Sequence, residues 1–286
     1  MKINSLYPQF NLEKFIADSL KEDVGDGDHT SLACVPTSAK GKAKLLVKQD
    51  GIIAGVELAK TIVKKVDASL HITQFKKDGD KIKKGDIVFT VEGKAQSILK
   101  AERLVLNCMQ RMSGIATYTS HLAQLCKGTK AKAIDTRKTT PGLRALEKWA
   151  VKIGGGDNHR FGLYDMILIK DNHVDYSGGI KNAIIAANDY LKKKNKKLKI
   201  EIEARNLEEV KQILSVGKVD RILLDNFSIP DLKKAIKLIS EKYETEASGG
   251  ITEENIRSYA QCGVDYISIG ALTHSVKSLD LSLKAT

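Results

Sequence analysis

The sequence predicts an α/β protein whose C-terminal half is a (β/α) barrel. After residue 130, short apolar runs alternate with amphipathic segments, and strand–helix alternation is typical of a parallel sheet. The alternation is repeated often enough to favour a barrel. The apolar runs are 131–134, 166–169, 199–204, 221–224, 245–248 and 266–270, and the intervening helices are expected near 178–194, 206–216, 230–242 and 252–262.

The N-terminal part predicts a different arrangement, with mixed helices and short strands. Helical spacing over residues 9–20 is followed by an acidic turn at 22–31, which lacks the closing Glu of a calcium-binding EF-hand. A strand, a turn and a second strand are expected over 40–56, then a helix near 56–66. Residues 70–92 are typical of short strands joined by tight turns, and 95–127 of a long helix in which Gly114 is expected to mark a break.

The positive net charge raises the question whether the protein binds nucleic acid. The chain has 286 residues and a net charge of +12, and its densest basic run covers residues 191–199. That run is expected at a helix end, where lysines interact favourably with the helix dipole. Aromatic residues make up only 5% of the chain, and no nucleic-acid module signature is present. A nucleic-acid-binding protein is therefore the less favoured alternative, and no nucleic-acid partner is expected.

Membrane and redox signals point to the cytoplasm. No stretch is long and apolar enough to span a bilayer, and the first residues are too polar for a signal peptide. Neither a membrane partner nor secretion is therefore expected. The four cysteines are Cys34, Cys108, Cys126 and Cys262, and their spacing matches no metal site. They are expected to be thiols in a reducing compartment.

Chemically active side chains follow the expected barrel strands at their C-terminal ends, where barrel active sites gather. Cations end the first strands, carboxylates end the middle ones, and small residues end the last two, where barrels often bind phosphate. A further cationic pair, His159 and Arg160, follows the triple glycine at 154–156. The strand-end residues are Arg137, Lys138, Lys170, Glu203, Asp225, Ser248, Gly249, Gly250 and Gly270. Together they predict a pocket for a small molecule with several negative charges.

Each of these residues also has a simpler explanation. Lysine and arginine are abundant in the chain, and a single one is more often a solvated surface charge. Arg103 lies within the long helix, where pairing with a nearby Glu is the simpler interpretation. Glu201 and Glu203 share one face of their strand, and one of them could simply pair with a lysine.

Several motifs taken together resemble the quinolinate phosphoribosyltransferase family, also called nicotinate-nucleotide pyrophosphorylase (carboxylating). These motifs occur in the expected order over nearly the whole chain. They are EDVGDGDHTS, AERLVLNCMQRMSGIAT, DTRKTTPGLR, GGGDNHRFGLYDMILIKDNH, IEIEA, ILLDNF, EASGGI and ISIGALTHS.

The resemblance implies the type II phosphoribosyltransferase fold. An N-terminal α/β sandwich domain would cover residues 1–112, and an incomplete seven-stranded (β/α) barrel would cover 113–275. The tail, 276–286, would return to the first domain. The resemblance also implies a homodimer or a hexamer in which Arg103 reaches the neighbouring subunit's active site.

The implied activity is that of a glycosyltransferase, a pentosyltransferase that joins quinolinate to phosphoribosyl pyrophosphate. The products are nicotinate mononucleotide, pyrophosphate and carbon dioxide, on the route to NAD. A related enzyme using nicotinate or another acidic base is the alternative. The cofactor implied is Mg²⁺, carried mainly by the pyrophosphate near Glu203 and Asp225. The implied substrate-binding residues are Arg103, Thr136, Arg137, Lys138, His159, Arg160, Lys170, Glu203, Asp225, Ser248, Gly249, Gly250, Gly270, Ala271 and His274. Lys138, Lys170, Glu203 and Asp225 would be catalytic, and which lysine assists decarboxylation stays open.

Overall fold

The structure is a computed structural model that describes residues 3–286, and the chain divides into two compact units. The first unit extends to Ser120 and also takes in Thr140–Gly155 and Ser275–Thr286. The second consists of His121–Thr139 and Gly156–His274. Each unit has its own sheet, and the candidate site residues, apart from Arg103, all belong to the second.

The first unit is built on a four-stranded antiparallel sheet in the order β12-β1-β5-β3. The C-terminal strand β12 pairs with β1 along its whole length, so the tail of the chain belongs to this unit. A separate two-stranded ribbon joins β2 and β4. The strands are β1 (Lys40–Val47), β2 (Gly51–Ile52), β3 (His71–Gln74), β4 (Lys81–Ile82), β5 (Ile87–Lys94) and β12 (Leu281–Ala285).

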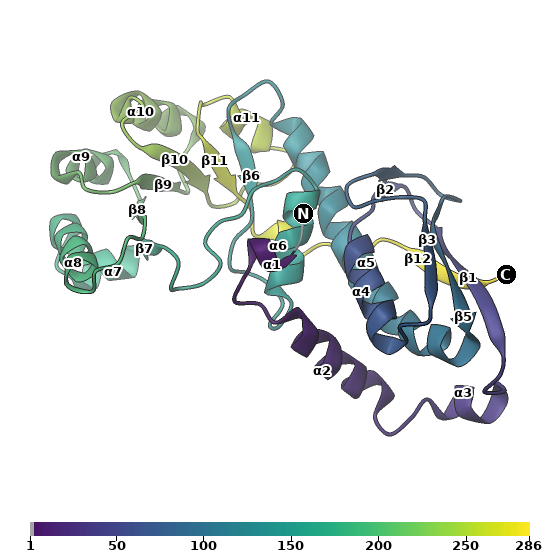
Figure 1. Cartoon of the computed structure of the whole chain (residues 1–286). Helices are drawn as coiled ribbons and strands as arrows, with labels where there is room; N and C mark the ends of the chain where they lie inside the picture. Colours follow the sequence, from purple (N-terminus) through teal and green to yellow (C-terminus); the bar gives the residue numbers. More distant parts are fainter. Residues whose placement is uncertain (1–2) are drawn as a thin grey trace. The chain divides into compact units, whose positions relative to one another are not determined.

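Helices cover this sheet and bury its apolar face. Alternate residues of β1 are buried, as expected for a strand with one face in a core. Val63 of α4, Phe89 of β5 and Ile98 of α5 line the same small interior space, together with Leu283 of β12. Figure 1 shows α4 and α5 beside the sheet. The helices of this unit are α1 (Ile3–Leu6), α2 (Leu12–Val24), α3 (His29–Cys34), α4 (Val56–Val66), most of α5 (Ala95–Leu125) and α6 (Arg144–Ile153).

The long helix α5 runs without interruption through Gly114, so the break expected there is wrong. A Cβ at Gly114 would overlap the carbonyl oxygen of Lys277, which lies in the segment leading to β12. The glycine is therefore needed for close approach of the C-terminal segment, and not for a bend. The helix also continues past residue 112, where the domain boundary was expected, and the compact units divide at Ser120.

Helix α6 lies in a segment for which no helix was expected. Its residues from Ala145 to Val151 are all buried, including Glu147 and Lys148. The sequence of α6 is amphipathic, with charged residues at 144, 147, 148 and 152, and two of these, Glu147 and Lys148, are buried in the fold. Glu147 is held by the Arg111 guanidinium at 2.8 Å, and it also accepts a hydrogen bond from the Thr140 backbone N–H.

The second unit contains a parallel sheet in the order β6-β11-β10-β9-β8-β7. A single parallel bridge between Ile134 and Asp157 adds a rudimentary seventh position beside β6. Within residues 3–286 the sheet does not close, because β7 forms the opposite edge. The incomplete α/β barrel is thus confirmed. The strands are β6 (Lys132–Ile134), β7 (Ile167–Ile169), β8 (Ile200–Ala204), β9 (Arg221–Asp225), β10 (Glu244–Ser248) and β11 (Tyr266–Ser268).

Helices connect successive strands along the outside of this sheet (Figure 1). Asn206 and Ser228 cap the first turns of α9 and α10, so each helix begins soon after the preceding strand ends. These short connections keep the loops at the C-terminal edge compact. The helices of this unit are α7 (Asp171–Tyr176), α8 (Ile180–Lys193), α9 (Leu207–Val216), α10 (Ile229–Ile239), α11 (Ile256–Ala260) and α12 (Ala271–His274). No helix within residues 3–286 combines the length and apolarity that crossing a membrane requires.

Candidate active site

The candidate residues of the second unit lie along one edge of the parallel sheet. Ser248 pairs with Asp225 at the ends of β10 and β9, and Glu203 pairs with Leu223 on the neighbouring strand. Because parallel strands all end at the same edge, the residues that follow β6, β7 and β11 lie at this edge too. The side chains expected from six separate segments therefore meet in one region of the sheet.

Two arginines lie close together at the β6 end of this edge. Burial and the positive charge of Arg137 lower the pKa of Arg160, whereas Glu201 and Asp165 raise it. Nη1 of Arg160 donates to the backbone carbonyl of Met166 at 3.1 Å, which fixes the direction of the fork. Two adjacent cations repel, and an anion bound between them would remove that repulsion.

His159 precedes this arginine and points into the interior of the barrel. Its side chain is only 7% exposed, and Nε2 lies 2.9 Å from Oε2 of Glu201. The other ring nitrogen, Nδ1, accepts a hydrogen bond from the Arg160 backbone N–H at 2.7 Å. The structure thus connects His159 to buried carboxylates and to the backbone of Arg160.

The middle strands present two carboxylates and a lysine. Glu203 is 7% exposed, and its Oε2 lies 3.3 Å from Nζ of Lys170, which follows β7. Burial raises the pKa of Glu203, Lys170 lowers it, and the negative charge of Asp225 raises it further. Asp225 accepts a hydrogen bond from the side-chain amide of Asn226 at 2.6 Å. The ion pair that Glu203 makes with a lysine is the simpler interpretation raised from the sequence, and here the lysine belongs to the site.

The loop after β10 has a backbone that requires glycine. Gly249 has a φ of +93°, and a Cβ there would overlap the side chain of Asn226. Gly250 also has a positive φ, +59°, with open space around it. Ser248 accepts a hydrogen bond at its backbone carbonyl from the Asn226 N–H. This loop therefore exposes backbone groups without side chains, as anion-binding loops do.

Lys138, which follows β6, lies close to the loop after β11. A Cβ at Gly270 would lie 2.9 Å from Nε2 of His274 and 3.0 Å from Cδ of Lys138. The Thr273 hydroxyl donates to the Lys138 carbonyl at 2.8 Å, and the Lys138 N–H donates to the Thr136 hydroxyl. Gly270 precedes Ala271, the first residue of α12. Lys138 thus lies beside the expected phosphate loop.

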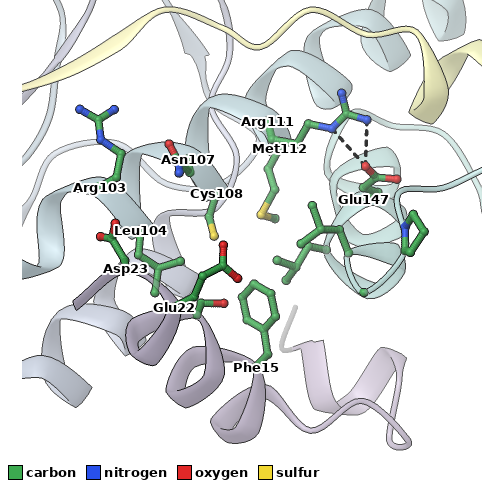
Figure 2. Close-up of a pocket in the computed structure, with 15 residues that line it drawn as sticks. Phe15, Glu22, Asp23, Arg103, Leu104, Asn107, Cys108, Arg111, Met112 and Glu147 are labelled. Carbon is green, nitrogen blue, oxygen red and sulfur yellow. Dashed lines mark hydrogen bonds and ion pairs between the residues drawn. The ribbon is translucent and has the colours of Figure 1, made fainter. Parts of the chain in front are cut away.

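Arg103 belongs to the first unit, where it lines a cavity of about 410 Å³ between α2, α5 and α6. Figure 2 shows its guanidinium pointing away from the Arg111–Glu147 ion pair on the other side of the cavity. Among residues 3–286, no acidic side chain forms an ion pair with Arg103, and the side chain is exposed. The simpler expectation of a Glu partner is therefore wrong.

Sequence reasoning missed three features of the second unit. Asn226 has a left-handed backbone with a φ of +55° and contacts both Asp225 and the Gly249 loop, and only its place in the ILLDNF motif marked it. Glu246 was overlooked because its run, TEAS, was examined only at its end. Arg221 pairs with Glu246 from a neighbouring strand, a partnership that sequence spacing does not reveal.

Two family models together match most of the chain. The model of the quinolinate phosphoribosyl transferase C-terminal domain matches residues 115–284, and that of the N-terminal domain matches residues 28–113. The chain is 48% identical to the chloroplastic nicotinate-nucleotide pyrophosphorylase (carboxylating) of Arabidopsis thaliana, over 97% of this chain and 84% of the relative. It is 42% identical to a probable enzyme of the same name from Bacillus subtilis, over 96% and 93%.

Solved structures with similar sequences have the same fold. The crystal structure of NadC from Streptococcus pyogenes matches with a TM-score of 0.92 and 37% identity, over 96% of both chains. The nicotinate-nucleotide pyrophosphorylase of Francisella tularensis matches with a TM-score of 0.90, also at 37% identity and over 96% of both chains. The chain belongs to the quinolinate phosphoribosyl transferase family.

Proposed function

We propose that the residues gathered at the C-terminal edge of the parallel sheet carry out the family's reaction in three adjoining regions. The enzyme transfers the phosphoribosyl group of phosphoribosyl pyrophosphate to quinolinate and releases pyrophosphate and carbon dioxide. The product is nicotinate mononucleotide, an intermediate of NAD biosynthesis. The observation that supports the proposal is the order of side chains along one edge: cations after β6 and β7, carboxylates on β8 and β9, and glycine loops after β10 and β11.

The first region is a clamp for the two carboxylates of quinolinate. The charge of Arg137 acts on Arg160, and Lys170, which follows β7, is the third cation assigned to this region. Guanidinium forks bind carboxylates in two places at once, which fixes the plane of the ring. Holding the ring nitrogen in line with the anomeric carbon supplies much of the rate, because the reaction then needs little further ordering. His159 joins this region through Arg160.

The second region binds the ribose ring. Breaking the bond from the anomeric carbon to pyrophosphate gives a transition state with oxocarbenium character. Glu203 and Asp225 lie on neighbouring strands, so they can hold ribose hydroxyls while tolerating a cationic ring. Their carboxylate oxygens are also the hard ligands that suit Mg²⁺. Mg²⁺, when bound with the pyrophosphate, neutralises charge on the leaving group.

The third region holds the 5′-phosphate. The residues after β10 and β11 offer backbone N–H groups and small side chains, and the short helix α12 begins there. Lys138 and His274 approach Gly270 closely and add positive charge or hydrogen bonds. The residues assigned to this region are Ser248, Gly249, Gly250, Gly270, Ala271 and His274. Lys138 lies between the phosphate and the pyrophosphate in this arrangement.

Decarboxylation follows from the charge of the glycosylated ring. Once the nitrogen carries ribose, the ring is a pyridinium, and loss of carbon dioxide from the adjacent carbon leaves a carbanion beside a positive charge. Lys170 already compensates Glu203 at 3.3 Å, whereas the stem of Lys138 packs against Gly270. Either ammonium group can stabilise the carbanion or deliver the proton that replaces the carboxylate. Lys138→Met and Lys170→Met identify which lysine does so, when the rate of carbon dioxide release is compared with the rate of phosphoribosyl transfer in each variant.

The direct test is incubation with quinolinate, phosphoribosyl pyrophosphate and Mg²⁺, followed by mass detection of nicotinate mononucleotide. Quinolinate labelled in its 2-carboxylate should release one labelled carbon dioxide for each nucleotide formed. Nicotinate is the matched alternative substrate, because it forms the same nucleotide without releasing carbon dioxide. Nucleotide formed from nicotinate at equal or higher kcat/KM would contradict the dicarboxylate clamp.

A homodimer with shared active sites is the proposed assembly. The support is Arg103, an exposed arginine without an ion-pair partner among residues 3–286. Mixing Arg103→Ala with Lys138→Ala, each inactive alone, should restore part of the activity, because some mixed dimers contain one intact site. No recovery after verified subunit exchange would contradict the shared site.

A cytoplasmic location is also proposed. Four free thiols are present in the described chain, and three of them, Cys108, Cys126 and Cys262, are buried. Free buried thiols are typical of a reducing compartment. The chloroplastic name of the Arabidopsis relative belongs to that protein. Fractionation of the source cells, with detection of the intact chain by antibody, tests the location.

A further inference from the structure

A group of fully buried charged side chains lies inside the barrel, behind the carboxylate clamp. Glu201 of β8 and Glu246 of β10 are both 0% exposed, and the mechanism above uses neither. Nε2 of His159 lies 2.9 Å from Glu201 Oε2 and 3.6 Å from Glu246 Oε1. Burying two carboxylates costs much free energy unless each is compensated, so their presence needs an explanation.

Arg221 compensates only part of this charge. Its Nη1 donates to Glu246 Oε2 at 2.9 Å, and its guanidinium lies 3.9 Å above the centre of the Tyr266 ring. Both carboxylate oxygens of Glu201, and Oε1 of Glu246, have no hydrogen-bond donor among the described residues, so the 2.9 Å approach of His159 to Glu201 is a charge contact. A proton shared between the two carboxyl groups would supply the missing bond and remove one negative charge. Consistently, burial and the charge of Glu201 raise the pKa of Glu246 to about 8.

The hydrogen bonds of His159 fix its tautomer. Nδ1 accepts from the Arg160 backbone N–H, so the ring proton belongs on Nε2, where it faces Glu201. The backbone N–H of His159 donates to Asp135, another fully buried carboxylate, at 3.0 Å. The imidazole is therefore a rigid link between the buried Glu201 and the backbone of Arg160.

We propose that Glu201 and Glu246 are positioning residues for quinolinate binding. The Glu201 carboxylate attracts the Nε2 edge of the His159 ring at 2.9 Å, Glu246 holds Glu201 in place, and His159 fixes Arg160 in the carboxylate clamp. The inference rests on the proposed role of Arg160. It explains why the barrel keeps charged groups at positions where apolar side chains would pack at lower cost.

The same three groups lie within 4.8 Å of one another, a spacing that also suits metal ligands. The hydrogen bonds favour the positioning role. The proton on Nε2 occupies the lone pair that a metal would need, and Arg221 already supplies positive charge to Glu246. A proton between Glu201 and Glu246 would thus reduce the buried negative charge without a metal ion.

Steady-state kinetics with paired variants test the proposal. Glu201→Leu removes the carboxylate that faces His159 at similar volume, and should raise KM for quinolinate about tenfold while leaving KM for phosphoribosyl pyrophosphate within about twofold. Glu201→Gln keeps a polar oxygen facing His159 and should restore most of the quinolinate affinity. Glu244→Gln is the matched control, because Glu244 also contacts Arg221 but does not touch His159, and both KM values should stay near those of the wild type. Equal increases in both KM values for Glu201→Leu, or no change in either, would overturn the inference.

A second measurement uses the unmodified protein. Nitrogen-15 spectra of the six histidines, with His159 identified by its loss in His159→Gln, should show the Nε2–H tautomer. An Nδ1–H tautomer or a doubly protonated ring at neutral pH would overturn the inference even if Glu201→Leu does not fold. Arg160→Ala distinguishes a failure of the carboxylate clamp from a failure of the positioning role of Glu201. If it binds quinolinate normally, the clamp is wrong; if it is impaired while Glu201→Leu is not, only the positioning role is wrong.

Discussion

Removing one arginine of the clamp should weaken recognition of quinolinate without unfolding the protein. Arg160 is partly buried, and its pKa is lowered by burial and by the neighbouring Arg137. Relief of the repulsion with Arg137 offsets part of the lost hydrogen bond to the Met166 carbonyl, so Arg160→Ala should change the urea midpoint little. The charge-assisted bond that it makes to a carboxylate contributes about 1.5–3 kcal/mol. The expected loss in kcat/KM for quinolinate is therefore about 10- to 150-fold.

The assay is the initial rate of nicotinate mononucleotide formation with each substrate varied in turn. KM for quinolinate should carry most of the effect in Arg160→Ala, and Arg160→Lys should be intermediate, because lysine keeps the charge but loses the fork. Arg205→Ala is the matched control. Arg205 follows β8 directly, but Glu209 and Asp175 already hold its guanidinium, so its removal should leave kcat/KM near the wild-type value. A quinolinate kcat/KM within about twofold of wild type for Arg160→Ala would refute the clamp.

Three further predictions concern particular positions. Gly249→Ala should lower the free energy of unfolding by about 1–2 kcal/mol, because its φ is +93° and the added Cβ would displace Asn226. It should also raise KM for phosphoribosyl pyrophosphate. Gly128→Ala, at φ +83° in open space, is the control for backbone strain alone, and an equal rise in KM there would contradict the phosphate assignment. Burial and the charge of Glu201 raise the pKa of Glu246 from 4.5 to about 8 in the folded protein, so its stabilising contribution is complete below pH 4.5 and disappears as the pH rises through about 8. The urea midpoint of the wild type should therefore fall relative to that of Glu246→Gln between pH 5 and 9. A constant difference between the two midpoints would count against the raised pKa. Gly114→Ala should destabilise the first unit although alanine favours helices by about 1 kcal/mol, because the added methyl would overlap the Lys277 carbonyl, and a raised unfolding temperature would contradict that packing.

The sequence predicted the second unit well because its strands are short apolar runs separated by amphipathic helices. All six runs became strands of the parallel sheet, and the rule that barrel sites gather at strand ends brought Arg137, Lys170, Glu203 and Asp225 to one edge. The barrel's incompleteness followed only from the family resemblance. The seventh position is a single bridge at Asp157, too short to leave a periodic pattern.

Other features depend on contacts between distant residues and left no local signal. The amphipathic sequence of α6 is typical of a helix, although none was expected there, and the burial of its charged residue Glu147 depends on Arg111, which is distant in the sequence. Gly114 was interpreted through helix propensity, whereas packing against the C-terminal segment decides its role. Glu201 shows the same limit: its spacing placed it on the face of Glu203, but its partners His159 and Glu246 come from other segments.

The most direct test of the account is a crystal structure of the protein with quinolinate bound. The account predicts both carboxylates within hydrogen-bonding distance of cations from separate segments, Arg137 and Arg160 among them, with the ring nitrogen facing the side of Glu203 and Asp225. Quinolinate bound elsewhere, or held at this edge without contact to either arginine, would contradict it.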